Sequence, residues 1–137
     1  YNDDKQPDIA EKLSSDFDMV ITQKMNLNKA DYYATMGTSK AIFSCALHEN
    51  LGISVMEAVL TGAIPIVPDR CSYAEMYLPE FKYPSEWTEN YEQFIYHRDD
   101  MVKFINTRLV YNFADYQDLI KQQQQILIKD YLSSSIM

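Results

Sequence analysis

Residues 41 to 67 read AIFSCALHENLGISVMEAVLTGAIPIV, and this stretch decides the fold class. The first seven residues, Ala41 to Leu47, are almost all apolar, which is typical of a strand buried on both faces of a parallel sheet. A polar loop from His48 to Gly52 comes next. A helical pattern then runs from Ile53 to about Thr61, where Gly62 is expected to end it. The stretch therefore predicts a strand, a loop and a helix in close succession.

Further strands follow the same alternating pattern. Ala63 to Val67 predicts the next strand, and Pro65 within it indicates a sheet edge or a strand end. Phe17 to Thr22 and Phe81 to Tyr83 are two shorter strand candidates. Strands separated by helices of about ten residues point to a parallel, doubly wound sheet. We expect an α/β fold with a Rossmann-like parallel sheet and flanking helices.

The remaining pattern is helical, and residues 1–137 are expected to form a single domain with a helical C-terminal tail. The last helix carries four consecutive glutamines, which we interpret as a solvated face. Asp99 is expected to cap the helix that follows it. The predicted helices are Asp8 to Ser15, Asn28 to Met36, Ser72 to Leu78, Glu89 to Tyr96, Asp100 to Val110 and Phe113 to Tyr131.

Composition narrows the class of protein. A net charge of −8, from 20 acidic and 12 basic residues, leaves no basic surface for wrapping a nucleic-acid backbone. No apolar run is long enough for a membrane span, and the two cysteines lack metal-ligand spacing. We expect a cytoplasmic protein with reduced thiols, without a metal site or a cofactor. The first residue is Tyr1, so we expect the chain to be a fragment of a longer polypeptide.

Three features coincide in the loop before the central helix. Gly52 lacks a Cβ, so the backbone can turn tightly and a ligand can come close. The helix that begins next has free N–H groups and a positive dipole end, which suit a phosphate. Glu49 lies in the loop and Glu57 lies one turn into the helix, and helical side chains lean toward the N-terminus. Since a carboxylate accepts two hydrogen bonds, each glutamate could bind a vicinal diol.

This spacing also has a purely structural interpretation. Two glutamates eight residues apart are common, and the negative charge of Glu57 could simply interact with the positive end of the helix dipole. Spacing alone therefore does not decide between a sugar-nucleotide site and an ordinary helix terminus.

The segment resembles the E-x7-E region of retaining GT-B glycosyltransferases. That family shows a Glu, an apolar residue with Gly, a Glu-Ala pair, a Gly and then a Pro-Val strand. The longer string from Ala46 to Val59, with PDRCSYAE after it, resembles the queuosine-tRNA mannosyltransferase-like branch. The residues that match the family pattern are Glu49, Leu51, Gly52, Glu57, Ala58, Gly62, Pro65 and Ile66.

The resemblance implies a role for each matching position. Glu49, as the catalytic candidate, would hold hydroxyls of the donor hexose, and Glu57 would bind the ribose diol of a nucleoside-diphosphate sugar. The turn at Gln23 to Met25 would lie near the base. Backbone contacts to sugar and diphosphate would come from Asn50, Leu51, Gly52 and Ile53.

Two basic residues near the same loop have open roles. His48 could donate to a phosphate or an acceptor, or it could merely orient its own loop. Arg70 follows a predicted strand and could face the diphosphate, or it could form a salt bridge with Asp69 or Glu75. Trp87 could stack on a sugar ring, although partial burial against the late helices is the simpler expectation.

The resemblance also has gaps. The family's C-terminal domain opens with a strand, a Gly-rich turn and an Arg/Lys pair, and this chain shows none of these. We therefore expect an isolated chain to bind a donor but not to complete the transfer, with the acceptor, a nucleic acid among the candidates, held by another domain of the parent. The alternatives are a binding or assembly module of the same shape and a GT-B-fold sugar-nucleotide epimerase.

Overall fold

A computed structural model describes residues 5–17, 41–48, 52–111 and 116–132. The predictions for residues 18–40 therefore lie outside the described residues. They include the helix from Asn28, the turn at Gln23 to Met25 and all but the first residue of the strand from Phe17. The strands are β1 (Ala41–Phe43), β2 (Ile64–Pro68) and β3 (Lys82–Tyr83). The α-helices are α1 (Pro7–Leu13), α4 (Ile53–Leu60), α5 (Tyr73–Met76), α6 (Tyr91–Tyr96), α7 (Arg98–Asn106) and α8 (Tyr116–Leu127). Shorter helical turns are η2 (Pro79–Phe81), η3 (Ser85–Thr88), η4 (Thr107–Tyr111) and η5 (Ile128–Leu132).

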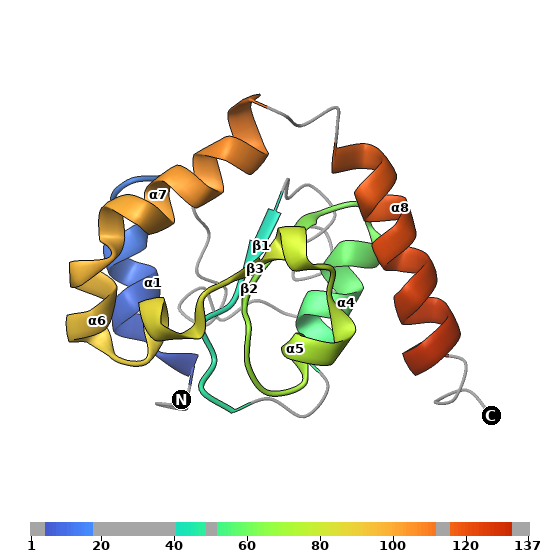
Figure 1. The fold of residues 1–137 in the computed structure, drawn as a ribbon, viewed down its shortest axis with the longest axis horizontal. Coiled ribbons are helices and arrows are strands. Elements are labelled where there is room, and N and C mark those ends of the chain that lie inside the picture. Colours follow the sequence, from blue (N-terminus) through green and yellow to red (C-terminus); the bar gives the residue numbers. More distant parts are fainter. Residues whose placement is uncertain (1–4, 18–40, 49–51, 112–115, 133–137) are drawn as a thin grey trace, which may run out of the picture.

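The three strands form one parallel sheet in the order β1-β2-β3. Ala41 pairs with Ile64, and Val67 pairs with Lys82. Helices α1, α6 and α7 lie on one side of the sheet, and α4, α5 and α8 lie on the other (Figure 1). The expected α/β class, the parallel sheet and the helices on both faces are confirmed, as is the C-terminal helix.

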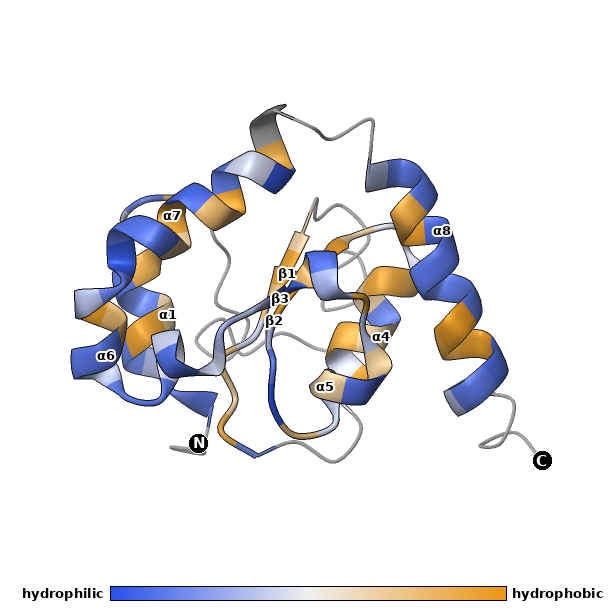
Figure 2. Cartoon of the chain, in the orientation of Figure 1, coloured by the Kyte–Doolittle hydropathy of each residue, from blue (hydrophilic) through white to orange (hydrophobic). Residues whose placement is uncertain are grey.

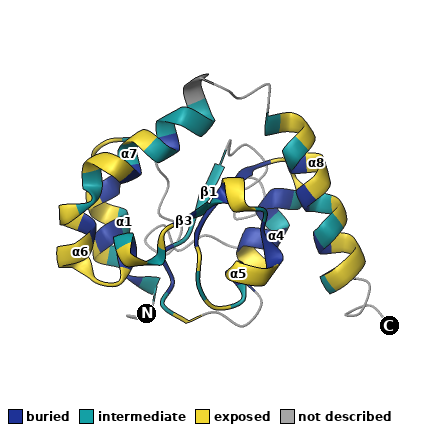
Figure 3. Cartoon of the chain, in the orientation of Figure 1, coloured by how far each residue is buried: buried dark blue, intermediate teal, exposed yellow. Residues whose placement is uncertain are grey.

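Each side of the sheet has its own apolar cluster. The helices turn their apolar residues toward the sheet (Figure 2), and buried residues follow the same inner faces (Figure 3). Because successive side chains of a strand point to opposite faces, Ile64 and Ile66 of β2 join one cluster and Val67 joins the other. The first cluster contains Ile9, Leu13, Phe81, Phe94, Met101 and Ile105, and the second contains Val55, Met56, Val59, Tyr73, Met76 and Leu127.

Helix α4 begins and ends at the glycines that the sequence indicated. Gly52 has φ 65° and precedes the first helical residue. Gly62 has φ 106°, and the N–H groups of Gly62 and Ala63 donate to the carbonyls of Val59 and Ala58. This pair of bonds is the Schellman arrangement, which needs a residue with positive φ.

The strand predicted from Ala41 to Leu47 is shorter than expected. β1 ends at Phe43, and the chain from Ser44 onward leaves the sheet after one more backbone bond, from Ser44 N–H to the Ile66 carbonyl at 3.0 Å. An apolar run marks burial but not pairing, and here burial continues through Cys45 and Ala46 without a ladder.

The prediction that Pro65 marks a sheet edge was wrong, because Pro65 lies in the central strand β2. The Ile66 carbonyl points toward β1, since it accepts from Ser44 N–H, so the backbone polar groups of Pro65 point the other way. On that side β3 pairs only from Val67 onward. The missing N–H of Pro65 therefore removes no ladder bond.

Two details of the late helices also differ from expectation. Helix α7 begins at Arg98 with His97 at its N-cap, so Asp99 lies inside the first turn instead of capping it. In α8 the four glutamines are not one solvated face, because Gln123 is fully buried. Its side-chain oxygen accepts from Leu78 N–H at 2.6 Å, and its amide nitrogen donates to the Met76 carbonyl at 2.7 Å.

The described ranges contain neither a candidate membrane span nor a candidate metal site. Within them, no helix is long and apolar enough to cross a bilayer. Likewise, no group of three or more His, Cys, Asp or Glu side chains in these ranges could hold a metal ion.

Gln123 provides a test of the packing between α5 and α8. Replacing Gln123 with Ala leaves a buried N–H and a buried carbonyl without their partner, so we expect the free energy of unfolding to fall by about 2–4 kcal/mol. Gln122→Ala, at an exposed neighbouring position of the same helix, should cost less than about 0.5 kcal/mol. Urea unfolding followed by circular dichroism measures both, and equal losses would contradict the structure.

Candidate functional site

The candidate site lies at the carboxyl edge of the parallel sheet. β1, β2 and β3 end at Phe43, Pro68 and Tyr83. Because parallel strands end at the same edge, the segments after them meet there, and α4 starts beside them (Figure 1). The predicted loop therefore leaves the sheet at the place where ligands of α/β proteins are usually bound.

Four consecutive carbonyls after β1 accept hydrogen bonds from side chains. We call the segment Ser44 to Leu47 the carbonyl platform. Ser44 O accepts from the Tyr83 hydroxyl at 2.6 Å, and Leu47 O accepts from the Cys71 thiol at 3.1 Å. The two carbonyls between them accept from Arg70. Since these groups have left the sheet ladder, the side chains replace the backbone donors that a strand would have supplied.

Arg70 joins the three segments that follow the three strands. Its Nε donates to Ala46 O at 3.0 Å, and its two terminal nitrogens donate to Cys45 O, to Thr88 O, and to both the carbonyl and the hydroxyl of Ser85 at 2.9–3.3 Å. These five bonds use all five N–H donors of a guanidinium group. Arg70, which itself follows β2, thus connects the platform after β1 to the turn after β3.

The contacts of Arg70 in the described residues include neither of the two salt bridges that the sequence suggested, to Asp69 or to Glu75. Asp69 pairs instead with the Lys82 ammonium at 3.5 Å, and the hydrogen-bond partners recorded for Arg70 in the described part of the chain are all neutral oxygens. Its positive charge is therefore held at the carboxyl edge. A direct contact between Arg70 and a diphosphate stays a prediction. Because all five N–H groups of Arg70 already donate to protein oxygens, one of them would have to donate to its present acceptor and to a phosphate oxygen at once.

Gln6 reaches the same platform from the other end of the chain. It is buried, has a left-handed backbone with φ 52°, and precedes α1. Its amide nitrogen donates to Cys45 O at 2.8 Å and to Thr88 O. Arg70 donates to the same two carbonyls. The sequence contained no signal for this contact, because Gln6 is 39 and 82 residues from its partners.

Burial keeps two groups beside the platform in their protonated forms. Burial raises the pKa of the Cys45 thiol to about 12, although the charge of Arg70 lowers it in part. Burial also raises the pKa of the Tyr83 hydroxyl well above its usual range. Tyr83 therefore remains a hydrogen-bond donor to Ser44 O at neutral and moderately alkaline pH. Cys45 is buried, as the apolar run from Ala41 to Leu47 predicted.

The first two residues of α4 carry exposed side chains, whereas Gly52 before them and Val55 and Met56 after them are buried. Ile53 is 58% exposed and Ser54 is exposed, and Gly52 has no side chain that could cap the helix. The first intrahelical bond runs from Met56 N–H to Gly52 O, so the N–H groups of the first turn have no helical acceptor. Glu57, the fifth residue of the helix, is half-buried.

The structure places only part of the predicted site. His48 is exposed at the end of the platform. Glu49, Asn50 and Leu51 lie outside the described residues, so the convergence of Glu49 and Glu57 on one pocket stays a prediction. Trp87 is half-buried against Tyr83 and Phe104, as the simpler expectation had it.

Fold and site together define an α/β protein with a parallel sheet, in which the N-terminus of a helix lies at the carboxyl edge of the sheet. Among curated proteins, the chain is similar to the tRNA-queuosine alpha-mannosyltransferase of Drosophila melanogaster, with 34% identity over 58 residues. The match covers 42% of this chain and 15% of that protein. This similarity suggests a relationship to glycosyltransferases. No protein-family profile and no solved structure matches the chain.

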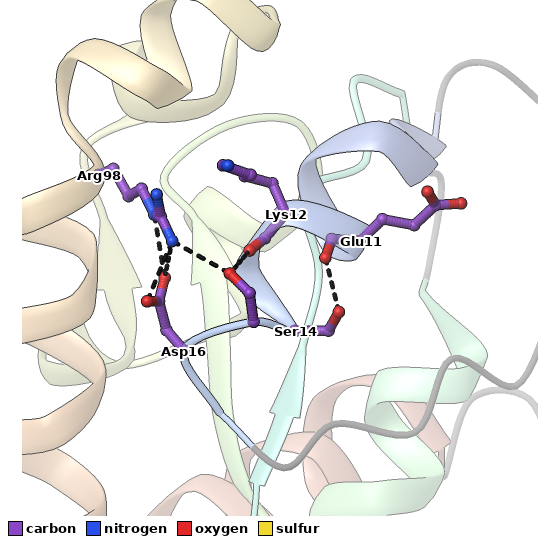
Figure 4. A network of polar contacts seen from close by, with 6 residues as sticks. Glu11, Lys12, Ser14, Asp16 and Arg98 are labelled. Carbon is purple, nitrogen blue, oxygen red and sulfur yellow. Dashed lines mark hydrogen bonds and ion pairs between the residues drawn. The ribbon is translucent and has the colours of Figure 1, made fainter.

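Arg70 can be tested against another arginine of the same chain. Arg70→Lys keeps the charge but has three donors for five acceptors, so we expect the free energy of unfolding to fall by about 2–4 kcal/mol. Arg98, which binds Asp16 and Ser15 at the surface between α7 and α1 (Figure 4), is the control. Arg98→Lys should cost less than about 1 kcal/mol. Urea unfolding measures both, and a small loss for Arg70→Lys would contradict its bridging role.

The two thiols should differ sharply in reactivity. The thiolate is the nucleophile, and Cys45 is both buried and protonated up to high pH, whereas Cys71 is exposed. We expect iodoacetamide at pH 8 to modify Cys71 alone in the folded chain and both cysteines in urea. Mass spectrometry of the tryptic peptides distinguishes the sites, and rapid native labelling of Cys45 would show that the platform is open.

Proposed function

We propose that this chain is the nucleotide-sugar-binding lobe of a retaining glycosyltransferase with the GT-B fold, its sheet being part of a Rossmann-like domain. The observation that carries the proposal is that α4 starts at the carboxyl edge of a parallel sheet, directly after Gly52 with its left-handed backbone, and that Ile53 and Ser54 at this start are exposed. The partial similarity to a mannosyltransferase supports the same assignment. On this proposal the donor is a nucleoside-diphosphate sugar.

The donor would be bound in three parts. Its diphosphate would accept from the N–H groups of the first turn of α4, where the helix dipole also favours negative charge. Glu57 would accept both hydroxyls of the ribose, and Glu49 would hold hydroxyls of the hexose. Backbone groups of Asn50, Leu51 and Ile53 would line the space between these two carboxylates.

Catalysis would depend on stabilising the charge of the departing diphosphate. The helix mouth supplies fixed N–H dipoles for this purpose. Arg70 adds a positive charge whose recorded partners in the described segments are neutral, and exposed His48 could donate a further hydrogen bond. Retention of configuration would follow from the family, with Glu49 as the carboxylate nearest the transferred sugar.

The acceptor would be held by a second domain of the parent enzyme. The Drosophila protein is named for mannosyl transfer to queuosine in tRNA, which makes a mannose donor and a nucleic-acid acceptor the first candidates here. The net charge of −8 argues that this lobe does not itself hold the nucleic acid.

Calorimetric titration with GDP, UDP and ADP, each compared with its 2′-deoxy form, tests the donor site. We expect the wild type to bind one of the ribonucleotides and to discriminate against its 2′-deoxy form. Glu57→Gln should weaken ribonucleotide binding by about five- to thirtyfold, because a charge-assisted pair of bonds is lost. It should also remove the discrimination.

Glu75→Gln, at an exposed position of α5, is the matched control and should bind as the wild type does. If none of the three nucleotides binds, the donor site is refuted, and a non-catalytic assembly module becomes the better assignment. If they bind, product analysis with the full-length parent separates a transferase from a sugar-nucleotide epimerase.

A further inference from the structure

The amide of Gln6 is not needed to satisfy the carbonyls that it contacts. Cys45 O and Thr88 O each accept a bond from Arg70 at 2.9 and 3.2 Å. A carbonyl oxygen has two lone pairs, so Gln6 supplies a second donor to groups that already have one. Its contribution must therefore be the connection that it makes between distant segments.

That connection joins the segment before α1 to the carbonyl platform. Cys45 also donates from its thiol back toward this segment, to Lys5 O at 3.4 Å and Gln6 O at 3.6 Å. The two segments thus exchange bonds in both directions. The Gln6 backbone is held at φ 52°, a conformation that costs a non-glycine residue free energy, and these contacts offset that cost.

We propose that Gln6 is a positioning residue that holds the carbonyl platform, from whose end the chain continues toward α4. The platform ends at Leu47, whose carbonyl accepts from the Cys71 thiol, and α4 begins six residues later at Ile53. Both ends of the loop are anchored, at the platform and at Gly52. The four residues from His48 to Leu51 connect the platform to Gly52, so the position of the platform sets where this connection starts. Where it concerns nucleotide binding, the inference rests on the proposed function.

A substitution at Gln6 can remove this connection and still leave a donor for each of the two carbonyls. Gln6→Met keeps a similar volume and loses both N–H donors, while Arg70 still bonds the two carbonyls. We therefore expect this variant to fold. Gln6→Gly removes the side chain too, but it relieves the strained backbone, so the pair separates the role of the amide from that of the backbone.

Two readouts need no ligand. In a Cys71→Ser background, the labelling rate of Cys45 reports the opening of the segment that covers it. Hydrogen exchange of the peptide containing Ser44 to His48, followed by mass spectrometry, reports the mobility of the platform. We expect Gln6→Met and Gln6→Gly to accelerate both by about tenfold or more, as the loss of two hydrogen bonds implies.

Gln123→Ala is the control for a merely structural effect. It removes two buried hydrogen bonds on the α5 and α8 side of the sheet, so it should lower global stability without selective exchange at Ser44 to His48. If Gln6→Met leaves Cys45 labelling and platform exchange unchanged, or accelerates them no more than Gln123→Ala does, the inference is overturned. If Gln6→Gly slows them, the backbone and not the amide governs the segment, which also overturns it.

Nucleotide titration then links the platform to the donor site. The nucleoside diphosphate that the wild type binds best should bind Gln6→Met about three- to tenfold more weakly. Faster exchange with unchanged affinity would overturn the link between Gln6 and the donor site. If the wild type binds no nucleotide, the donor site is refuted. If Gln6→Met still accelerates exchange in that case, the control of the platform by Gln6 is established independently of the donor site.

Discussion

The carboxyl edge of this sheet depends on the hydrogen bonds that satisfy four consecutive carbonyls, from Ser44 to Leu47. Once the chain leaves β1, these groups have lost the donors of a neighbouring strand, and a buried carbonyl without a partner costs roughly 1–3 kcal/mol. Side chains from Gln6, Arg70, Cys71 and Tyr83 supply the missing donors. The stretch therefore has a defined conformation although it belongs to no helix or strand.

The same bonds connect the site to the core of the molecule. Tyr83 is packed in the cluster between the sheet and α1, α6 and α7, and its hydroxyl emerges at the platform. Arg70 lies after the central strand and gathers the segments that follow β1 and β3. Helix α4 starts beside this edge, and in its first turn Ile53 and Ser54 are exposed while Val55 and Met56 are buried. The proposed phosphate contact would form at this helix start.

Much of this frame could be predicted from local pattern. The order of strand, glycine, helix, glycine and strand between Ala41 and Pro68 was predicted correctly, because each step has a local cause: an apolar run, a positive-φ position and a helical period. The length of the first strand was not, since it ends at Phe43 and not at Leu47. Pro65 and the glutamine run of α8 were misjudged for a different reason. Whether Pro65 loses a ladder bond depends on how far β3 extends, and whether Gln123 is buried depends on where α5 packs. Neither neighbour is close in sequence.

The sequence by itself determined the α/β class, the parallel pairing implied by alternating strands and helices, and the two ends of α4, since these follow from interactions within a few residues. The donor site at Glu49, Gly52 and Glu57 rests on the family resemblance of this stretch and stays a prediction. Only the tertiary structure decided that Arg70 and Gln6 share the carbonyls of Cys45 and Thr88, because hydrogen bonds between residues up to 82 positions apart form only after the sheet has brought its strand ends together.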